Sequence, residues 1–176
     1  DGEGLLLGVN TENMWSKLQA IASRIPGWSP VEQLFALYHL ALLSERKGAL
    51  ILEVGGWCGR SAAALALGAA QGAGHVYVVD LFPGRDDWKR NADGSYSFSS
   101  SIEGEEHKGY HDQTVWSEPF ERDMKPVYNE FPNLIDAFHS YIRAEGLQEL
   151  VTPFRGDAAS FLSRPENQRE YDLIFL

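Results

Sequence analysis

The chain has 176 residues, of which 44% are hydrophobic and 23% charged, which is enough for one globular domain with a hydrophobic core. Its formal net charge of −10 argues against nucleic acid as a partner, because binding to a polyanion requires a basic surface. The single cysteine excludes an internal disulfide and no run of about 18 apolar residues is present, so we expect a soluble, cytoplasmic protein with no membrane partner.

Two helices are predicted ahead of the first strand. Residues 13–24 and 30–46 have the apolar spacing of helices, and Ser29 is placed to cap the second one. We expect this segment to pack on the core, with a roof over the cofactor as the alternative role for the apolar face of the second helix. Residues 1–48 are therefore interpreted as an N-terminal helical segment, in which residues 1–10 form an arm or an initial turn.

The most informative segment places a glycine-rich loop between an apolar strand and a helix. Glycines let the backbone turn sharply off a buried strand and let a ligand approach closely. The helix that follows presents free N–H groups, and an acid at the tip of the next strand can accept both hydroxyls of a ribose. This pattern predicts a nucleoside site. Its parts are a strand (49–54), a loop with Gly55, Gly56 and Gly59, a helix (59–71), and a strand (75–80) that ends in Asp80.

The spacing of the loop favours S-adenosylmethionine over a dinucleotide. The pattern Glu53-x-Gly55-x-x-x-Gly59 differs from the dinucleotide pattern G-x-G-x-x-G, and one of its variable positions is the bulky Trp57. An acid at the end of the first strand would repel a pyrophosphate but attract a ligand that carries an ammonium and a sulfonium group. An NAD-dependent oxidoreductase and a non-catalytic nucleoside-binding module are the alternatives.

The segment EVGGWCGRSA (53–62) resembles motif I of class I S-adenosylmethionine-dependent methyltransferases, especially the small-molecule O-methyltransferases of the catechol and macrocin types. VVD (78–80), VTPFRGDAASFL (151–162) and YDLIFL (171–176) extend the resemblance. It implies methyl transfer to a hydroxyl group of a small-molecule acceptor. It also implies the cofactor contacts: Glu53, Gly55 and Ser61 at the methionine end with Trp57 beside it, Asp80 at the ribose, and Asp157 and Ala158 at the adenine edge, completed by Gly56, Gly59, Leu81 and Gly156.

Helices and strands alternate along the rest of the chain, which predicts an α/β fold. By resemblance we expect a Rossmann-like, doubly wound parallel sheet with strand order 3-2-1-4, and residues 49–176 as the S-adenosylmethionine-binding domain. Because the family's sheet has seven strands, we expect a chain truncated after the fourth strand. If the chain is instead complete, a partner chain must cover the bare edge, as in a homo-oligomer. The further elements are a helix (132–145), a strand (150–155), a helix (157–164) and a strand (171–176).

Residues 82–131 form a long connection, rich in Gly, Ser, aromatic and charged residues, that leaves the second strand where ligands bind. We interpret it as an acceptor-binding insertion or lid, with a surface excursion or an oligomer contact as the alternative. A hydroxyl acceptor must lose a proton, and His107 and His111 are the candidate catalytic bases by location. Mg²⁺ is a second route to deprotonation that the resemblance allows, but the sequence assigns no metal ligands.

Overall fold

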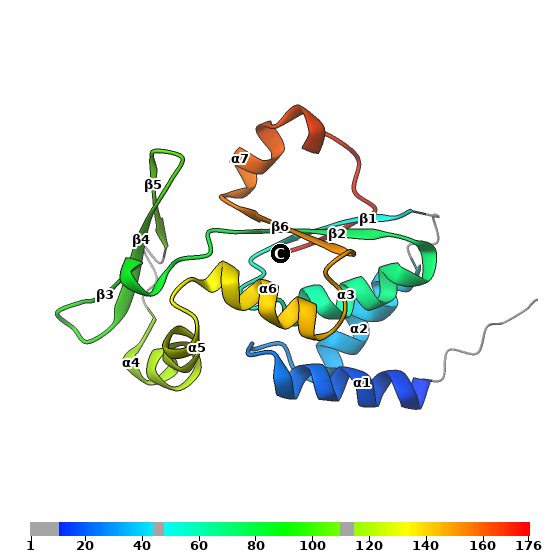
Figure 1. Cartoon of the computed structure of the whole chain (residues 1–176), viewed down its shortest axis with the longest axis horizontal. Coiled ribbons are helices and arrows are strands. Elements are labelled where there is room, and N and C mark those ends of the chain that lie inside the picture. The colour runs from blue at the N-terminus through cyan, green and yellow to red at the C-terminus, as the bar shows by residue number, and fades with distance from the viewer. Residues whose placement is uncertain (1–10, 44–47, 110–114) are drawn as a thin grey trace, which may run out of the picture.

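The computed structural model of the chain describes residues 11–43, 48–109 and 115–176 (Figure 1). At its centre is a parallel sheet of four strands in the order β6-β2-β1-β7. This arrangement confirms the predicted α/β fold and the predicted strand order 3-2-1-4. The strands are β1 (Leu50–Val54), β2 (His75–Asp80), β6 (Val151–Arg155) and β7 (Leu173–Phe175).

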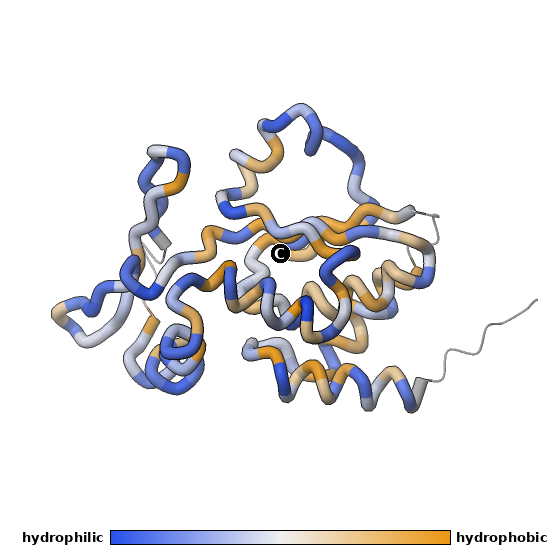
Figure 2. The backbone as a smooth tube through the Cα atoms, in the orientation of Figure 1, coloured by the Kyte–Doolittle hydropathy of each residue, from blue (hydrophilic) through white to orange (hydrophobic). Residues whose placement is uncertain are grey.

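The two central strands are buried on both faces, and their sequences are accordingly almost continuous apolar runs. Successive side chains point to opposite faces of the sheet. Ile51 therefore belongs to the main core on one face, whereas Leu52 belongs to a smaller cluster on the other. Figure 2 shows the hydrophobic residues gathered along these strands, with hydrophilic residues at the tips of the insertion.

Helices on one face of the sheet build the main core. All residues from Ser61 to Ala69 of the helix after β1 are buried, because its small alanine side chains let it lie close to its neighbours. The approach is tight enough that a Cβ on Gly68 would stand 2.3 Å from the carbonyl oxygen of Tyr38. The helices of this face are α1 (Thr11–Arg24), α2 (Val31–Leu43), α3 (Arg60–Ala69) and α6 (Leu134–Ala144) (Figure 1).

The opposite face carries α7 (Ala158–Ser163), whose Phe161 packs on Leu52 and Val79. At the β7 edge, Ile174 is 56% exposed. Among the described helices, none combines the length and apolar character needed to cross a bilayer. Short helical turns follow α3 and α7, namely η1 (Ala70–Gly72) and η4 (Pro165–Asn167), and a third, η2 (Arg85–Asp87), begins the connection after β2.

The long connection between β2 and α6 contains regular secondary structure along much of its length. Its first half is an antiparallel sheet, in which Glu103 and Gly104 make a two-residue turn with φ of 52° and 88°. The rings of Tyr96 and Phe120 stack with their centroids 3.8 Å apart and form a small core within the insertion. Its elements are β3 (Trp88–Arg90), β4 (Tyr96–Ile102), β5 (Glu105–Gly109), α4 (Ser117–Pro119), the π-helical η3 (Phe120–Met124) and α5 (Lys125–Glu130).

The boundaries of the predicted elements agree with the structure to about two residues, as is usual for fraying ends. The second helix was expected to reach residue 46, and the structure describes α2 as far as Leu43, so this predicted end is not tested. Residues 44–47, like the predicted arm at 1–10, lie outside the described residues. The N-terminal helices share one core with the sheet, since Leu18 and Leu34 belong to the same cluster as Ile51.

Candidate functional site

A cavity of about 450 Å³ opens at the carboxyl ends of β1, β2 and β6. Its walls come from the sheet and from the insertion, which lies beyond that end of the sheet in Figure 1. Ligands of parallel α/β sheets bind at this edge, and the volume is typical of small-molecule sites. Seven of the residues predicted to contact the cofactor line the cavity: Gly55, Trp57, Asp80, Leu81, Gly156, Asp157 and Ala158.

The glycine loop after β1 forms the floor of the cavity. Gly55 has a φ of +92°, a conformation that favours glycine, and no atom lies within 4 Å of the place its Cβ would occupy. The Cβ position of Gly56 points toward the sheet, where an added methyl group would lie 2.1 Å from Cγ1 of Val78. Gly59 stands at the start of α3 as its N-cap residue. The loop is thus open toward the cavity and packed against the sheet beneath.

Asp80, at the tip of β2, holds two neighbouring backbone segments together. Its Oδ2 accepts the N–H of Trp57 at 2.9 Å, and its Oδ1 accepts the N–H of Phe82 at 2.8 Å. Burial raises the pKa of this carboxyl, and the backbone hydrogen bonds oppose the change. Each carboxylate oxygen keeps a further lone pair. Asp80 can therefore brace the loop and still accept hydroxyl groups from the cavity.

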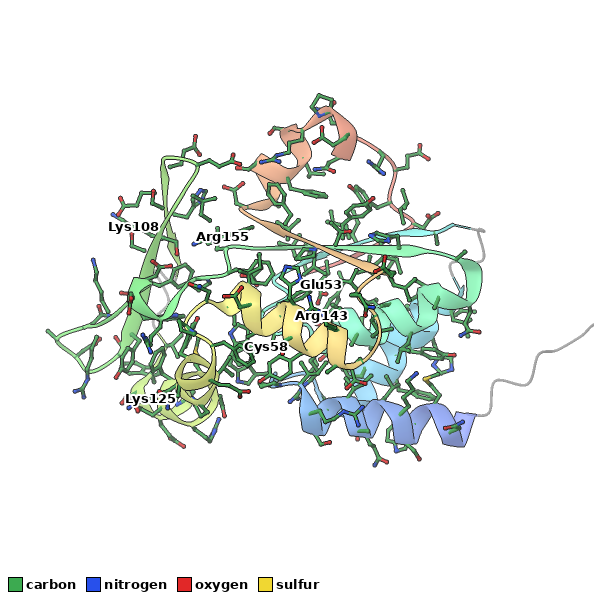
Figure 3. The ribbon with its side chains drawn as sticks, in the orientation of Figure 1. Glu53, Cys58, Lys108, Lys125, Arg143 and Arg155 are labelled. Carbon is green, nitrogen blue, oxygen red and sulfur yellow. The ribbon has the colours of Figure 1, made fainter. Side chains whose placement is uncertain are left out.

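Glu53 and Ser61 lie beneath the glycine loop and do not line the cavity. Glu53 is 0% exposed and lies in the interior of the domain (Figure 3). Its Oε1 accepts a hydrogen bond from the hydroxyl of Ser61. Its Oε2 has no hydrogen-bond partner among the described residues. Burial raises the pKa of Glu53 to about 7, the Ser61 hydrogen bond opposes this, and the charge of Asp80 adds to it. A buried carboxyl with one unsatisfied oxygen therefore stands under the loop.

Asp157 begins α7 at the side of the cavity next to β6. Its Oδ1 accepts the backbone N–H of Ser160 at 2.6 Å, and its Oδ2 lies 3.5 Å from Nδ1 of His107. The pKa of Asp157 is lowered, chiefly by the Ser160 hydrogen bond and to a smaller extent by His107. His107 comes from β5 of the insertion and lines a second, smaller cavity. His111 lies outside the described residues.

The cavity wall also includes residues that no sequence pattern indicated. Trp28, from the loop between α1 and α2, stacks on Trp57 with ring centroids 4.4 Å apart. No local sequence pattern identifies Trp28 as a wall residue, because its stacking partner Trp57 belongs to a different segment, the glycine loop after β1. Trp88 and Phe98 come from the insertion. Both line the cavity, together with Val54, Val79, Pro83 and Met124.

A metal site has no support in the described part of the chain. Among those residues, no group of three or more His, Cys, Asp or Glu side chains is arranged to hold a metal ion. Cys58 is buried, and burial raises the pKa of its thiol, so it is present as a small packing side chain rather than a reactive thiolate.

The sheet order, the glycine loop and the acid at the tip of β2 are the features of a Rossmann-like α/β domain. A family model described as a methyltransferase domain matches residues 52–176. The chain therefore belongs to this family of methyltransferase domains. The resemblance to class I S-adenosylmethionine-dependent methyltransferases is confirmed.

A solved structure with which the chain shares similarity is the O-methyltransferase from Bacillus cereus in complex with SAH. The two are 21% identical, with a TM-score of 0.45, and the match covers 97% of this chain and 55% of that one. The chain thus spans about half the length of that O-methyltransferase. No curated protein matches the chain.

Proposed function

We propose that the chain binds S-adenosylmethionine in the cavity and transfers its methyl group to a hydroxyl group of a small molecule. One observation carries the proposal: a methyltransferase-family chain has a cavity lined by Gly55, Asp80 and Asp157, from the ends of three adjacent strands. These are the positions at which the glycine loop, the ribose acid and the adenine edge were expected.

The proposed pose of the cofactor follows the order of the strands. The adenine lies beside Asp157 and Ala158, after β6, and the ribose hydroxyls bind Asp80, at the end of β2. The methionine end reaches the loop at Gly55, above Glu53. The open space at Gly55 leaves room for the ligand. The carboxyl of Glu53, buried beneath the loop with one unsatisfied oxygen, favours positive charge above the loop without touching it.

The protein's main contribution to such a reaction is positioning and the exclusion of water. When bound, S-adenosylmethionine would supply a methyl group activated by its positive sulfur: the acceptor oxygen would bond to the methyl carbon in line with the breaking C–S bond, and S-adenosylhomocysteine would leave. The floor at Gly55 and the walls from the insertion would hold the two reactants side by side. We therefore propose residues 82–131 as the acceptor-binding insertion, on a domain that comprises residues 49–176.

The acceptor proton still requires a base. His107 stays a prediction for this role, and its ring lies against Asp157, on the adenine side of the proposed pose. His111 stays a prediction as well. Magnesium dependence, a cytoplasmic location and assembly into a homo-oligomer stay predictions that are based on the sequence alone.

Calorimetric titrations with S-adenosylhomocysteine and with NAD, in parallel, test the proposed cofactor. We expect S-adenosylhomocysteine to bind and NAD not to bind. Asp80→Asn should weaken S-adenosylhomocysteine roughly tenfold or more, because hydrogen bonds from the ribose hydroxyls to a charged acceptor are lost. Asp136→Asn, at an exposed position on α6, is the matched control and should leave the affinity unchanged.

The outcomes separate the three candidate functions. Binding of NAD alone would favour the oxidoreductase. Binding of S-adenosylhomocysteine without methyl transfer to any hydroxyl acceptor would favour a module that holds a nucleoside without turnover. An unchanged affinity in Asp80→Asn would remove the ribose role of this residue.

A further inference from the structure

One wall of the cavity is assembled from three segments that are far apart in the sequence. Trp28 comes from the loop between α1 and α2, Trp57 from the glycine loop, and Met124 from η3 of the insertion. The two indole rings stack at 4.4 Å with an interplanar angle of 30°. Trp28 is 55% exposed, so the stack presents aromatic surface to the cavity and to solvent.

Asp123 fixes the orientation of Trp28. The indole Nε1–H of Trp28 donates to Oδ2 of Asp123 at 3.2 Å, which joins the N-terminal helical segment to the insertion. Asp123 also accepts two hydrogen bonds from Arg122, each at 2.7 Å. It belongs to a π-helical turn, an element that is frequent at functional sites.

The order of the strands places this wall away from the adenine end of the proposed cofactor pose. Asp157 follows β6 and Asp80 ends β2, whereas Trp57 follows β1, the next strand across the sheet. On the proposed function, the methionine end of the cofactor points toward Trp57. The stack of Trp28 on Trp57 then bounds the space in which the methyl group meets its acceptor.

The charge of the cavity restricts which acceptors can enter it. Of the described residues that line it, the charged ones are the carboxylates Asp80 and Asp157, and none is Lys, Arg or His. An acceptor with a carboxylate or phosphate group would be repelled. The faces of aromatic rings carry negative charge density and favour neutral or cationic ring compounds.

We propose that Trp28 is a specificity-determining residue of the acceptor site, held in position by Asp123, and that it selects flat ring compounds without negative charge. The proposal rests on the proposed function, because it places the acceptor relative to the cofactor. Trp28 provides the ring surface, and Asp123 acts through Trp28 as a positioning residue.

A matched pair of ring compounds tests the selection. The neutral 2-naphthol and the anionic 2-naphthoate are titrated near neutral pH into the chain saturated with S-adenosylhomocysteine, with calorimetric detection. We expect 2-naphthol to bind roughly tenfold tighter than 2-naphthoate. Trp28→Ala should weaken 2-naphthol roughly fivefold. Trp28→Phe keeps a ring but loses the hydrogen bond to Asp123, so it should recover only part of the affinity, and S-adenosylhomocysteine should bind both variants normally. Trp116→Ala, at a 61% exposed position outside the cavity lining, is the control and should change neither affinity.

A second set of variants isolates the role of Asp123. Asp123 and Glu118 both pair with Arg122, but of the two only Asp123 accepts the indole N–H of Trp28. Asp123→Ala should therefore weaken 2-naphthol and leave S-adenosylhomocysteine unaffected, whereas Glu118→Ala should change neither. Asp123→Asn keeps an oxygen for the indole and should restore 2-naphthol binding although the ion pair is lost.

The results that would overturn the assignment differ from those that would overturn the proposed function. If S-adenosylhomocysteine binds normally but 2-naphthoate binds as tightly as 2-naphthol, the charge selection is wrong. If 2-naphthol binds Trp28→Ala as it binds the unmodified chain, the role of Trp28 is wrong. If S-adenosylhomocysteine itself does not bind, the proposed function fails, and the placement of the acceptor fails with it.

Discussion

Replacing the buried Glu53 by glutamine should change how stability depends on pH. Glu53 is fully buried under the glycine loop, and burial raises its pKa from the ordinary 4.5 to about 7. The glutamine side chain would fill nearly the same volume and still accept the hydroxyl of Ser61, but it does not titrate. The comparison of Glu53→Gln with the unmodified chain therefore isolates the cost of ionising this one carboxyl.

The sign and size of the effect follow from proton linkage. Between pH 4.5 and about 7 the unfolded chain loses the Glu53 proton while the folded chain retains it, so folding stability falls as the pH rises. Below this window both states are protonated, and above it both are ionised. The difference between the two pKa values corresponds to about 3 kcal/mol of stability lost across the window.

Urea unfolding of both chains between pH 4.5 and 8, followed by circular dichroism, measures this loss. We expect the unmodified chain to lose about 3 kcal/mol relative to Glu53→Gln over this range. The control is Glu149→Gln at an exposed position, which should track the unmodified chain. A constant difference between Glu53→Gln and the unmodified chain at all pH values would refute the reasoning, because it would mean that the carboxyl titrates alike in both states.

Two further substitutions probe the loop and the predicted base. Gly56→Ala should destabilise the fold by about 1–3 kcal/mol in urea unfolding, because its methyl group would meet Val78. Gly84→Ala is the control, since its Cβ position has no atom nearer than 3.5 Å, and a loss as large as that of Gly56→Ala would contradict the steric argument. His107→Gln should lower turnover at least about a hundredfold, with unchanged S-adenosylhomocysteine affinity, if His107 is the general base. A loss of S-adenosylhomocysteine affinity alone would instead assign His107 to support of Asp157.

The sequence by itself determined the central sheet and the position of the cavity. Continuous apolar runs of strand length, separated by an alanine-rich helix, allow only a parallel sheet with helices packed on it. The glycine loop and Asp80 then fall at the carboxyl edge of that sheet, because parallel strands all end on the same side. Such features are local in the chain, and their consequences follow from backbone geometry.

Tertiary structure alone decided what surrounds and tunes that cavity. The stack of Trp28 on Trp57, the bond from Trp28 to Asp123 and the contact of His107 with Asp157 each join segments with no common sequence pattern. The raised pKa of Glu53 likewise arises from burial, which depends on every layer packed around the side chain. Local sequence encodes strands, turns and helix starts, whereas burial and contacts between distant segments exist only after the chain has folded.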